Sequence, residues 1–226
     1  MQISDQTREI LKNFASINES IILYKGDRIN TTSNAGNVMA RGTISEEFPS
    51  DACIYNLNEL LGTLVLFTSP DLEFHETHLT LSDDDSALNY FFADPTLINI
   101  STQTPAMDKL DQVLEFTLTH DALSSLQKAA SVMSLPDLIL INNEGELVLK
   151  TTDAKNSTSN NYGKDVGSTD IEEEFEFRFR TENLKLIDGD YAVTIAGKNG
   201  KYISQLENLN TDLTYYIALE PGSHVG

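Results

Sequence analysis

Short runs of alternating apolar and polar residues dominate this chain and restrict what it can fold into. In the run Phe175–Arg180 every second residue is a phenylalanine, and charged residues stand between them. Such alternation predicts a β-strand with one buried face and one face in water. The dipeptides Gly26-Asp27, Glu144-Gly145 and Asn199-Gly200 separate pairs of such runs and predict tight hairpin turns. The pattern favours antiparallel sheets in an α+β fold over a β-α-β fold.

Two segments, residues 5–17 and 121–135, have helical periodicity instead. Each carries one apolar stripe with residues three, four or seven apart. The stripes are Ile3, Ile10, Phe14 and Ile17 on the first segment, and Leu123, Leu126, Ala130 and Met133 on the second. Shorter helical stretches follow the strand-like runs near residues 54 and 175. A strand, a helix and a meander of strands thus recur four times, paired as two halves.

This order predicts two similar domains, residues 1–94 and 112–226. Residues 95–111 contain two prolines around a polar centre and predict an extended connector between the domains. The run 154–167 is rich in Asn, Ser and Gly, and we expect it to be a mobile surface loop.

The formal net charge is −20, so the positions of the few bases are informative. Arg8 and Lys12 lie opposite the apolar stripe of the first helix, and Lys128 lies opposite that of the second. No Asp or Glu occurs between Ala122 and Leu135. A helix face without acids in an acidic protein indicates an anionic partner such as nucleic acid, although an ordinary solvated face is the other interpretation. The net charge argues against tight, sequence-specific binding of duplex DNA.

The motifs predict neither an enzyme nor a cofactor or metal. His75 and His78 are three apart in a strand-like run, where such side chains point to opposite faces and should not share a metal ion. Cys53 is the only cysteine, which excludes an internal disulfide and fits a reducing cytoplasm. The N-terminus lacks the layout of a signal peptide, and no apolar run reaches the roughly 20 residues of a membrane span.

Three segments resemble a known family. Residues 10–18 (ILKNFASIN) and 54–61 (IYNLNELL) are similar to the first and second helical regions of the sliding clamp of T4-type bacteriophages. Residues 215–220 (YYIALE) resemble the last strand of that clamp, and also the tyrosine-rich last strand of proliferating cell nuclear antigen. The resemblance extends to the length of the chain, the order of its four units, the position of the connector and the net negative charge. Only the loop 154–174 has no family counterpart.

The resemblance implies a homotrimeric ring of two-domain subunits, with helices lining the hole and sheets outside. The ring would encircle duplex DNA and tether the replicative DNA polymerase. The implied partners are double-stranded DNA, that polymerase, an ATP-driven clamp loader and phage late-transcription factors, in the cytoplasm of an infected bacterium. Carried over by position, the residues facing DNA would be Arg8, Lys12, Lys128 and Lys185. The second helical stretch departs from the basic pattern, because its outward positions are Asn58, Gly62 and Val65.

The family layout also implies two protein-binding surfaces. A pocket for partner peptides would use Leu97, Ile98, Ile100, Tyr216 and Ala218. The subunit contact would pair the edge strands 87–93 and 146–152, with Tyr90, Phe92, Leu147 and Leu149 at the contact. For all these residues, packing in a domain core is the other interpretation.

An acidic mimic of DNA that inhibits a nucleic-acid-binding enzyme is the alternative function. Such a protein should place carboxylates where phosphates would lie, whereas Arg8, Lys12 and Lys128 stand on the helices. A closed trimer by native mass spectrometry would favour the clamp, and a monomer would favour the mimic.

Overall fold

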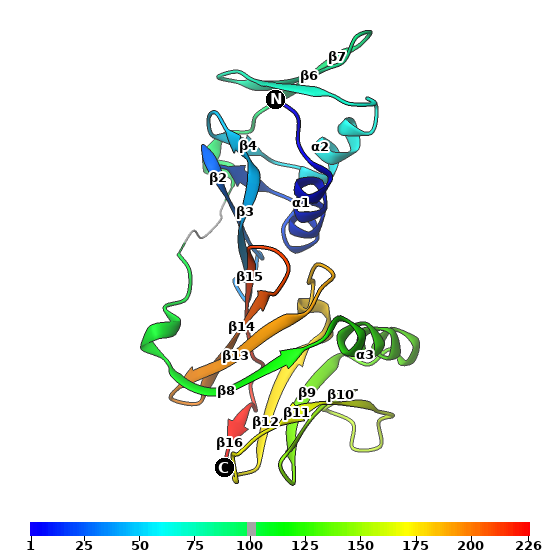
Figure 1. The fold of residues 1–226 in the computed structure, drawn as a ribbon, viewed down its shortest axis with the longest axis vertical. Coiled ribbons are helices and arrows are strands. Elements are labelled where there is room, and N and C mark those ends of the chain that lie inside the picture. The colour runs from blue at the N-terminus through cyan, green and yellow to red at the C-terminus, as the bar shows by residue number, and fades with distance from the viewer. Residues whose placement is uncertain (99–102) are drawn as a thin grey trace. The chain divides into compact units, whose positions relative to one another are not determined.

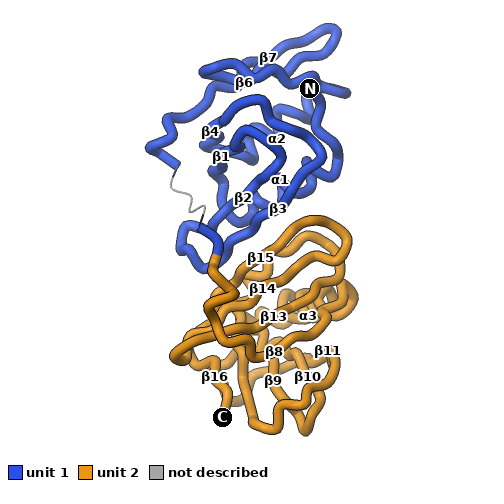
Figure 2. The backbone as a smooth tube through the Cα atoms, turned by 60° about the vertical axis from the view of Figure 1, so that its left-hand side comes forward, with its two compact units in different colours: residues 1–104 blue, residues 105–226 orange. Residues whose placement is uncertain are grey.

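The computed structural model describes residues 1–98 and 103–226, which form two compact units, residues 1–104 and 105–226 (Figure 2). The division falls inside the expected connector. The connector carries two short 3-10 turns, η1 (Pro95–Leu97) and η2 (Met107–Lys109). Among the described residues, no helix is long and apolar enough to cross a membrane.

Unit 1 packs two neighbouring helices against short antiparallel strands (Figure 1). Its elements are α1 (Asp5–Ile17), β1 (Ile21–Leu23), β2 (Gly26–Thr32), β3 (Val38–Phe48), β4 (Ala52–Ile54), α2 (Leu57–Leu64), β5 (Asp71–Phe74), β6 (His78–Ser82) and β7 (Ala87–Phe91). Strands β5, β6 and β7 form one sheet in that order. The helix α1 packs beside α2 and against β2 and β3.

The hairpin predicted at Gly26-Asp27 is wrong. β1 pairs with β4, while β2 pairs with β3. Ile21 and Leu23 are buried in β1, and all three residues of β4 are buried. Burying these apolar side chains against a distant strand outweighs the local turn signal. Gly26 instead begins β2 with a φ of 110°, a conformation that favours glycine.

Unit 2 repeats the architecture. Its elements are β8 (Asp111–Leu118), α3 (His120–Met133), β9 (Asp137–Asn143), β10 (Glu146–Thr152), β11 (Tyr162–Ser168), β12 (Phe175–Arg180), the 3-10 turn η3 (Thr181–Asn183), β13 (Tyr191–Lys198), β14 (Lys201–Asn208), β15 (Leu213–Ala218) and β16 (His224–Val225). One sheet has the order β11-β10-β9-β12-β16. In a second sheet β14 lies between β15 and β13, and β13 pairs with β8. The helix α3 packs on β10 and β11.

The predicted recurrence is confirmed in the order of elements. A helix, four strands, a shorter helical element and three strands occur as α1, β1–β4, α2, β5–β7 and again as α3, β9–β12, η3, β13–β15. Both apolar stripes point inward, since Phe14 and Leu126 are each 0% exposed. Asn199-Gly200 and Glu144-Gly145 turn with positive φ between paired strands, as predicted.

Two expectations about unit 2 are wrong. The run 154–167 is not wholly a mobile loop, because β11 begins at Tyr162 and pairs with β10 along its length. For the same reason β10 is not an edge strand, since β9 covers its other side. The edges of this sheet are β11 and the two-residue strand β16. The sequence pattern did not predict β11, because its glycines and polar residues have little preference for a strand. Backbone hydrogen bonds to β10 hold it in place.

Candidate nucleic-acid interface

The first candidate surface is the outward face of α1. Ser4 caps the helix, and its hydroxyl accepts a hydrogen bond from the Thr7 amide. Lys12 is exposed on this face. Arg8 is only 29% exposed in its side chain and lies 3.9 Å from the carboxylate of Asp5, so its charge is partly neutralised. Glu9 is also exposed here. This face therefore presents one clear base, Lys12.

A carboxylate from the neighbouring strand holds the start of α1. Glu46 in β3 accepts hydrogen bonds from the amide of Ser4, from the hydroxyl of Thr7 at 2.5 Å and from the hydroxyl of Ser45 at 3.0 Å. Burial raises the pKa of Glu46, but the hydrogen bonds from Thr7, Ser4 and Ser45 outweigh it, so the net pKa is lowered. The ionised carboxylate also interacts favourably with the positive end of the helix dipole.

The second helix contributes no base. Asn58, Gly62 and Val65 are exposed as the sequence predicted. Asn56 caps α2, and its side chain accepts a hydrogen bond from the Glu59 amide at 3.1 Å. Val65 is 81% exposed. The exposed face of α2 is therefore neutral to acidic and apolar at its C-terminal end.

The third helix has the expected basic face. Thr119 caps α3 by accepting a hydrogen bond from the Ala122 amide, and Ser134 ends it in the left-handed conformation with a φ of 54°. Lys128 is exposed on the face opposite the buried Leu126. After Asp121 the helix has no acidic residue. A phosphate near this face would meet a positive charge and serine hydroxyls.

Lys185 lies on a segment that is held against α3. Gln127 of α3 donates from Nε2 to the Leu184 carbonyl at 2.9 Å, and the His120 amide donates to the Asp190 carboxylate at 2.7 Å. Lys185 is exposed next to the first of these contacts. The expected fourth helix is reduced to η3, so this base stands on an extended segment and not on a helix.

Two buried tyrosines fix the same segment from inside. The hydroxyl of Tyr191 donates to the Ile187 carbonyl at 2.5 Å, and the Tyr215 hydroxyl accepts from the Ile187 amide at 3.2 Å. Burial raises the pKa of Tyr191 to about 12 and also raises that of Tyr215, so both stay protonated. The tyrosines thus hold the segment that follows Lys185, while the hydrogen bond from Gln127 to Leu184 joins the residues that precede Lys128 and Lys185. This arrangement of tyrosines was not predicted.

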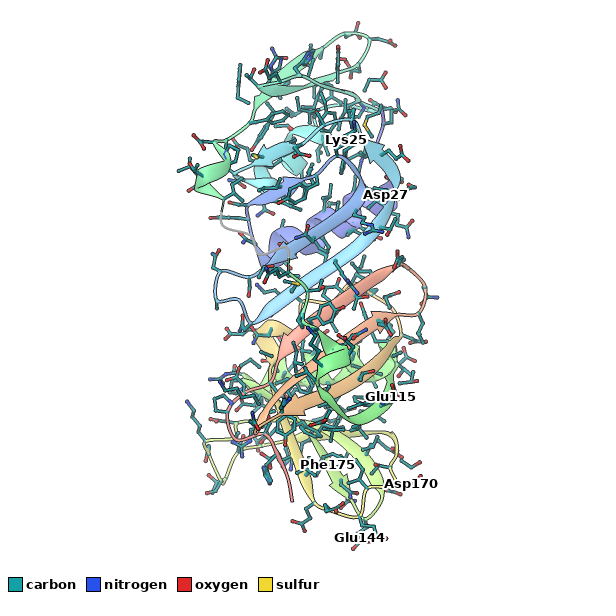
Figure 3. The ribbon with its side chains drawn as sticks, turned by 90° about the vertical axis from the view of Figure 1, so that its left-hand side faces the viewer. Lys25, Asp27, Glu115, Glu144, Asp170 and Phe175 are labelled. Atoms are coloured by element: carbon teal, nitrogen blue, oxygen red, sulfur yellow. The ribbon has the colours of Figure 1, made fainter. Side chains whose placement is uncertain are left out.

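Carboxylates gather on other parts of unit 2. Glu115 is exposed on β8, and Glu144 and Asp170 lie on loops at one end of the unit (Figure 3). The loops around Glu144 and Asp170 line a hollow that Glu172 and Glu174 also border. The face of α3 thus differs in charge from the end of the unit that carries this hollow.

The residues predicted for the peptide pocket differ in accessibility. Leu97 is 66% exposed and Ala218 is half-buried. Ile98 and Tyr216 are buried, at 7% and 3% exposure, so neither offers a free surface. Ile100 lies outside the described residues. For Ile98 and Tyr216 the interpretation as packed residues is the one that the burial supports.

The residues predicted for the subunit contact also differ in accessibility. β7 is an edge strand, as expected, but Tyr90 turns inward and its hydroxyl donates to the Asn56 carbonyl at 3.0 Å. The Phe92 amide is bound to the Thr77 carbonyl. The assignment of Leu147 and Leu149 to the subunit contact is wrong, because β10 is an interior strand. Their side chains lie in the core and are 0% and 1% exposed.

The two histidines do not lie on opposite faces of one strand. A turn separates β5 from β6, so the rings of His75 and His78 stack with centroids 4.4 Å apart. No cluster of three or more potential metal ligands occurs among residues 1–98 and 103–226. Cys53 is buried, and burial with the nearby Asp51 and Asp94 raises the pKa of its thiol. The thiol is therefore poorly suited to nucleophilic chemistry.

Known proteins match both units. A family model described as "DNA polymerase processivity factor" matches residues 4–101, and one described as "gp45 sliding clamp, C terminal" matches residues 115–221. The sliding clamp of Vibrio phage KVP40 is 31% identical over 97% of this chain and 99% of its own length. The sliding clamp of Enterobacteria phage T4 is 27% identical over 99% of this chain and 98% of its own.

Solved structures support the fold. The chain is similar to A. fulgidus PCNA bound to the C-terminal region of FEN-1, with a TM-score of 0.65, 13% identity and coverage of 97% and 96% of the two chains. It is also similar to PCNA from Entamoeba histolytica, with a TM-score of 0.63, 14% identity and coverage of 95% and 94%. Together with the relatives of near-equal length, these matches show that the chain belongs to the sliding clamps of phages, which are non-catalytic DNA polymerase processivity factors.

Proposed function

We propose that this sliding clamp works as a homotrimeric ring around duplex DNA, with α1, α3 and the segment of Lys185 facing the DNA. The observation that carries the proposal is the pair of exposed lysines, Lys12 and Lys128, each opposite a buried apolar stripe in a protein of net charge −20. Few bases suffice, because a closed ring is retained by topology and weak phosphate contacts permit sliding. The alternative of an acidic DNA mimic loses its basis, since the chain belongs to the clamp family.

Ring closure would also cover the exposed sheet edges. An unpaired edge strand is an aggregation hazard, and β7 and β11 are such edges in their units. A head-to-tail ring covers both edges in every subunit. This assignment replaces β10 by β11 and keeps β7. Native mass spectrometry of the chain should give a trimer, and a monomer at all concentrations would refute the ring.

Charge reversal tests the DNA-facing surface. Lys12→Glu combined with Lys128→Glu should leave the trimer intact, because both side chains are exposed, and should lower the stimulation of the polymerase on primed DNA. The deficit should shrink as salt is raised, since screening removes the same contacts from the wild type. Lys25→Glu combined with Lys201→Glu is the matched control; Lys25 lies between β1 and β2 (Figure 3), and both residues are exposed. Equal stimulation by test and control variants would show that the lysines do not face DNA.

The polymerase, an ATP-driven clamp loader and late-transcription factors are the proposed protein partners, in the cytoplasm of an infected bacterium. Ala218 at the end of β15 is the position at which we test partner binding, because it is only half-buried. Ala218→Arg should weaken binding of a peptide from the polymerase C-terminus, measured by calorimetry, in a ring of unchanged mass. Wild-type affinity in the assembled variant would place the peptide elsewhere.

A further inference from the structure

A groove, here named the α3–η3 groove, lies between the C-terminal end of α3 and η3. Its volume is about 640 Å³. Its polar lining residues are Gln127, Ser131 and Ser134 from α3 and its cap, and Arg180, Thr181 and Glu182 from the end of β12 and from η3. Among the described residues, neither Lys128 nor Lys185 lines it. The two lysines of unit 2 that we propose to face DNA thus stand outside it.

Hydrogen bonds between its two walls hold the groove in shape. Gln127 of α3 donates to the Leu184 carbonyl at 2.9 Å. The amide and the hydroxyl of Thr181 both donate to the Pro136 carbonyl, at 2.9 and 3.0 Å. Each contact joins α3, or the turn that follows it, to η3 or to the residue after η3. A groove that is preformed in this way can bind a partner without a large cost of ordering its own walls.

The charges in and beside the groove are predominantly negative. The guanidinium of Arg180 is already paired, with the carboxylate of Asp137 at 2.8 Å and with that of Glu220 at 3.8 Å. Glu182 is exposed, and its carboxylate forms no ion pair within the described part of the chain. The last turn of α3 contains no base, and the C-terminus of a helix carries a partial negative charge. The carboxylates and the helix end together outweigh the guanidinium, so the groove attracts a cation.

The groove adjoins the position at which we test partner binding. Ala218 ends β15, and Glu220, two residues further along the chain, reaches Arg180 in the groove. The Glu220 amide also donates to the Arg178 carbonyl at 2.8 Å, which fixes this stretch beside β12. Two residues span at most about 7 Å. A folded protein that is anchored at Ala218 would therefore lie over the groove as well.

We propose that the α3–η3 groove receives a lysine or arginine side chain from the folded body of the polymerase. The inference rests on the proposed partner site at Ala218 and adds a second, charged contact to it. A polymerase that holds primed duplex DNA neutralises phosphates with basic residues around its DNA channel. In the proposed complex the duplex passes from that channel into the ring, so the basic rim of the channel lies next to the ring. A DNA phosphate is disfavoured as the occupant, because it would meet Glu182 and the negative end of α3.

Reversing the charge of Glu182 tests this contact. Glu182→Lys alters an exposed side chain, so the variant should fold and assemble, which urea unfolding and native mass spectrometry check. Its dissociation constant for the full-length polymerase, measured without DNA, should rise about fivefold or more, mainly through slower association. That constant should also depend less on salt concentration than it does in the wild type. The peptide from the polymerase C-terminus should bind with unchanged affinity, because it lacks the folded body that supplies the base.

A second variant and a matched control locate the effect in the groove. Ser131 lines the groove from α3, so Ser131→Lys adds a cation to it and should weaken binding of the full-length polymerase in the same way. Glu207→Lys makes the same charge change as Glu182→Lys, on an exposed side chain of β14. Glu207 pairs with Thr214, at the other end of the β14–β15 ladder from Ala218. The Glu207 variant should bind polymerase and peptide like the wild type.

The possible failures have different signatures. Wild-type affinity of Glu182→Lys for the full-length polymerase, or an equal loss in Glu207→Lys, would overturn the inference. Unchanged polymerase binding together with slower dissociation of Glu182→Lys from nicked circular DNA would show that a phosphate occupies the groove instead. Weaker peptide binding by Glu182→Lys would place its effect at the peptide site and would also overturn the inference. The proposed partner site fails by another result, a wild-type ring that does not bind the peptide or an Ala218→Arg ring that binds it normally.

Discussion

The carboxylate of Glu46 offers a sharp test of how α1 is held in place. Glu46→Gln keeps the side-chain size and one carbonyl acceptor for the Ser4 amide. The hydroxyls of Thr7 and Ser45 can rotate and accept from the new amide group, so the main loss is the negative charge. Because α1 carries Lys12, the substitution also probes the support of the proposed DNA-facing surface.

The expected loss of stability is the sum of two modest effects. A charge-assisted hydrogen bond exceeds a neutral one by about 0.5–1.5 kcal/mol. An anion at a helix N-terminus contributes about 0.3–1 kcal/mol through the helix dipole. Together they predict that Glu46→Gln lowers the free energy of unfolding by about 1–2 kcal/mol at pH 7. Glu47→Gln, which changes the exposed neighbour, should change it by less than about 0.5 kcal/mol.

The effect should depend on pH with a defined sign. The folded-state pKa of Glu46 is lowered, so its stabilisation is fully present above the unfolded pKa of about 4.3 and is lost as pH falls through the folded pKa. Urea unfolding at a series of pH values from neutral down to about 3 follows this loss. Equal stability of the two variants at pH 7, or a Glu46→Gln deficit that persists undiminished in acid, would refute the reasoning.

Three further substitutions test the packing, each by urea unfolding. Leu126→Ala should cost about 2–5 kcal/mol, because the side chain that anchors α3 is 0% exposed; a cost below 1 kcal/mol would mean that the site collapses around the cavity. Ser134→Gly should stabilise by about 0.5–1 kcal/mol, since the helix ends there with a φ of 54°, and a loss of stability would contradict the cap assignment. Gly197→Ala should destabilise by about 1–3 kcal/mol, because its Cβ would lie 2.3 Å from the Tyr202 ring and 2.7 Å from the Lys201 carbonyl oxygen; wild-type stability would mean that this hairpin can yield.

Features that depend on neighbours in the chain were predictable from sequence. The strand Phe175–Arg180 alternates buried and half-buried residues as its pattern predicted. The stripes of α1 and α3 are buried except for the half-buried Met133, and Asn199-Gly200 turns between β13 and β14. In each case the periodicity of side chains or the allowed φ of a glycine decides the outcome locally. The exposed positions of Lys12 and Lys128 follow from the same helical geometry.

Features that depend on distant partners were decided only by the tertiary structure. β1 joins β4, and the polar run at Tyr162 becomes strand β11, because backbone hydrogen bonds to an existing strand outweigh weak local preference. That pairing moves Leu149 from a predicted contact into the core. It also places Tyr162 beside Val132 in a groove between α3 and β11. Periodicity assigns a residue to a face of its element, but only packing decides whether another strand covers that element, and so which side chains remain free to bind.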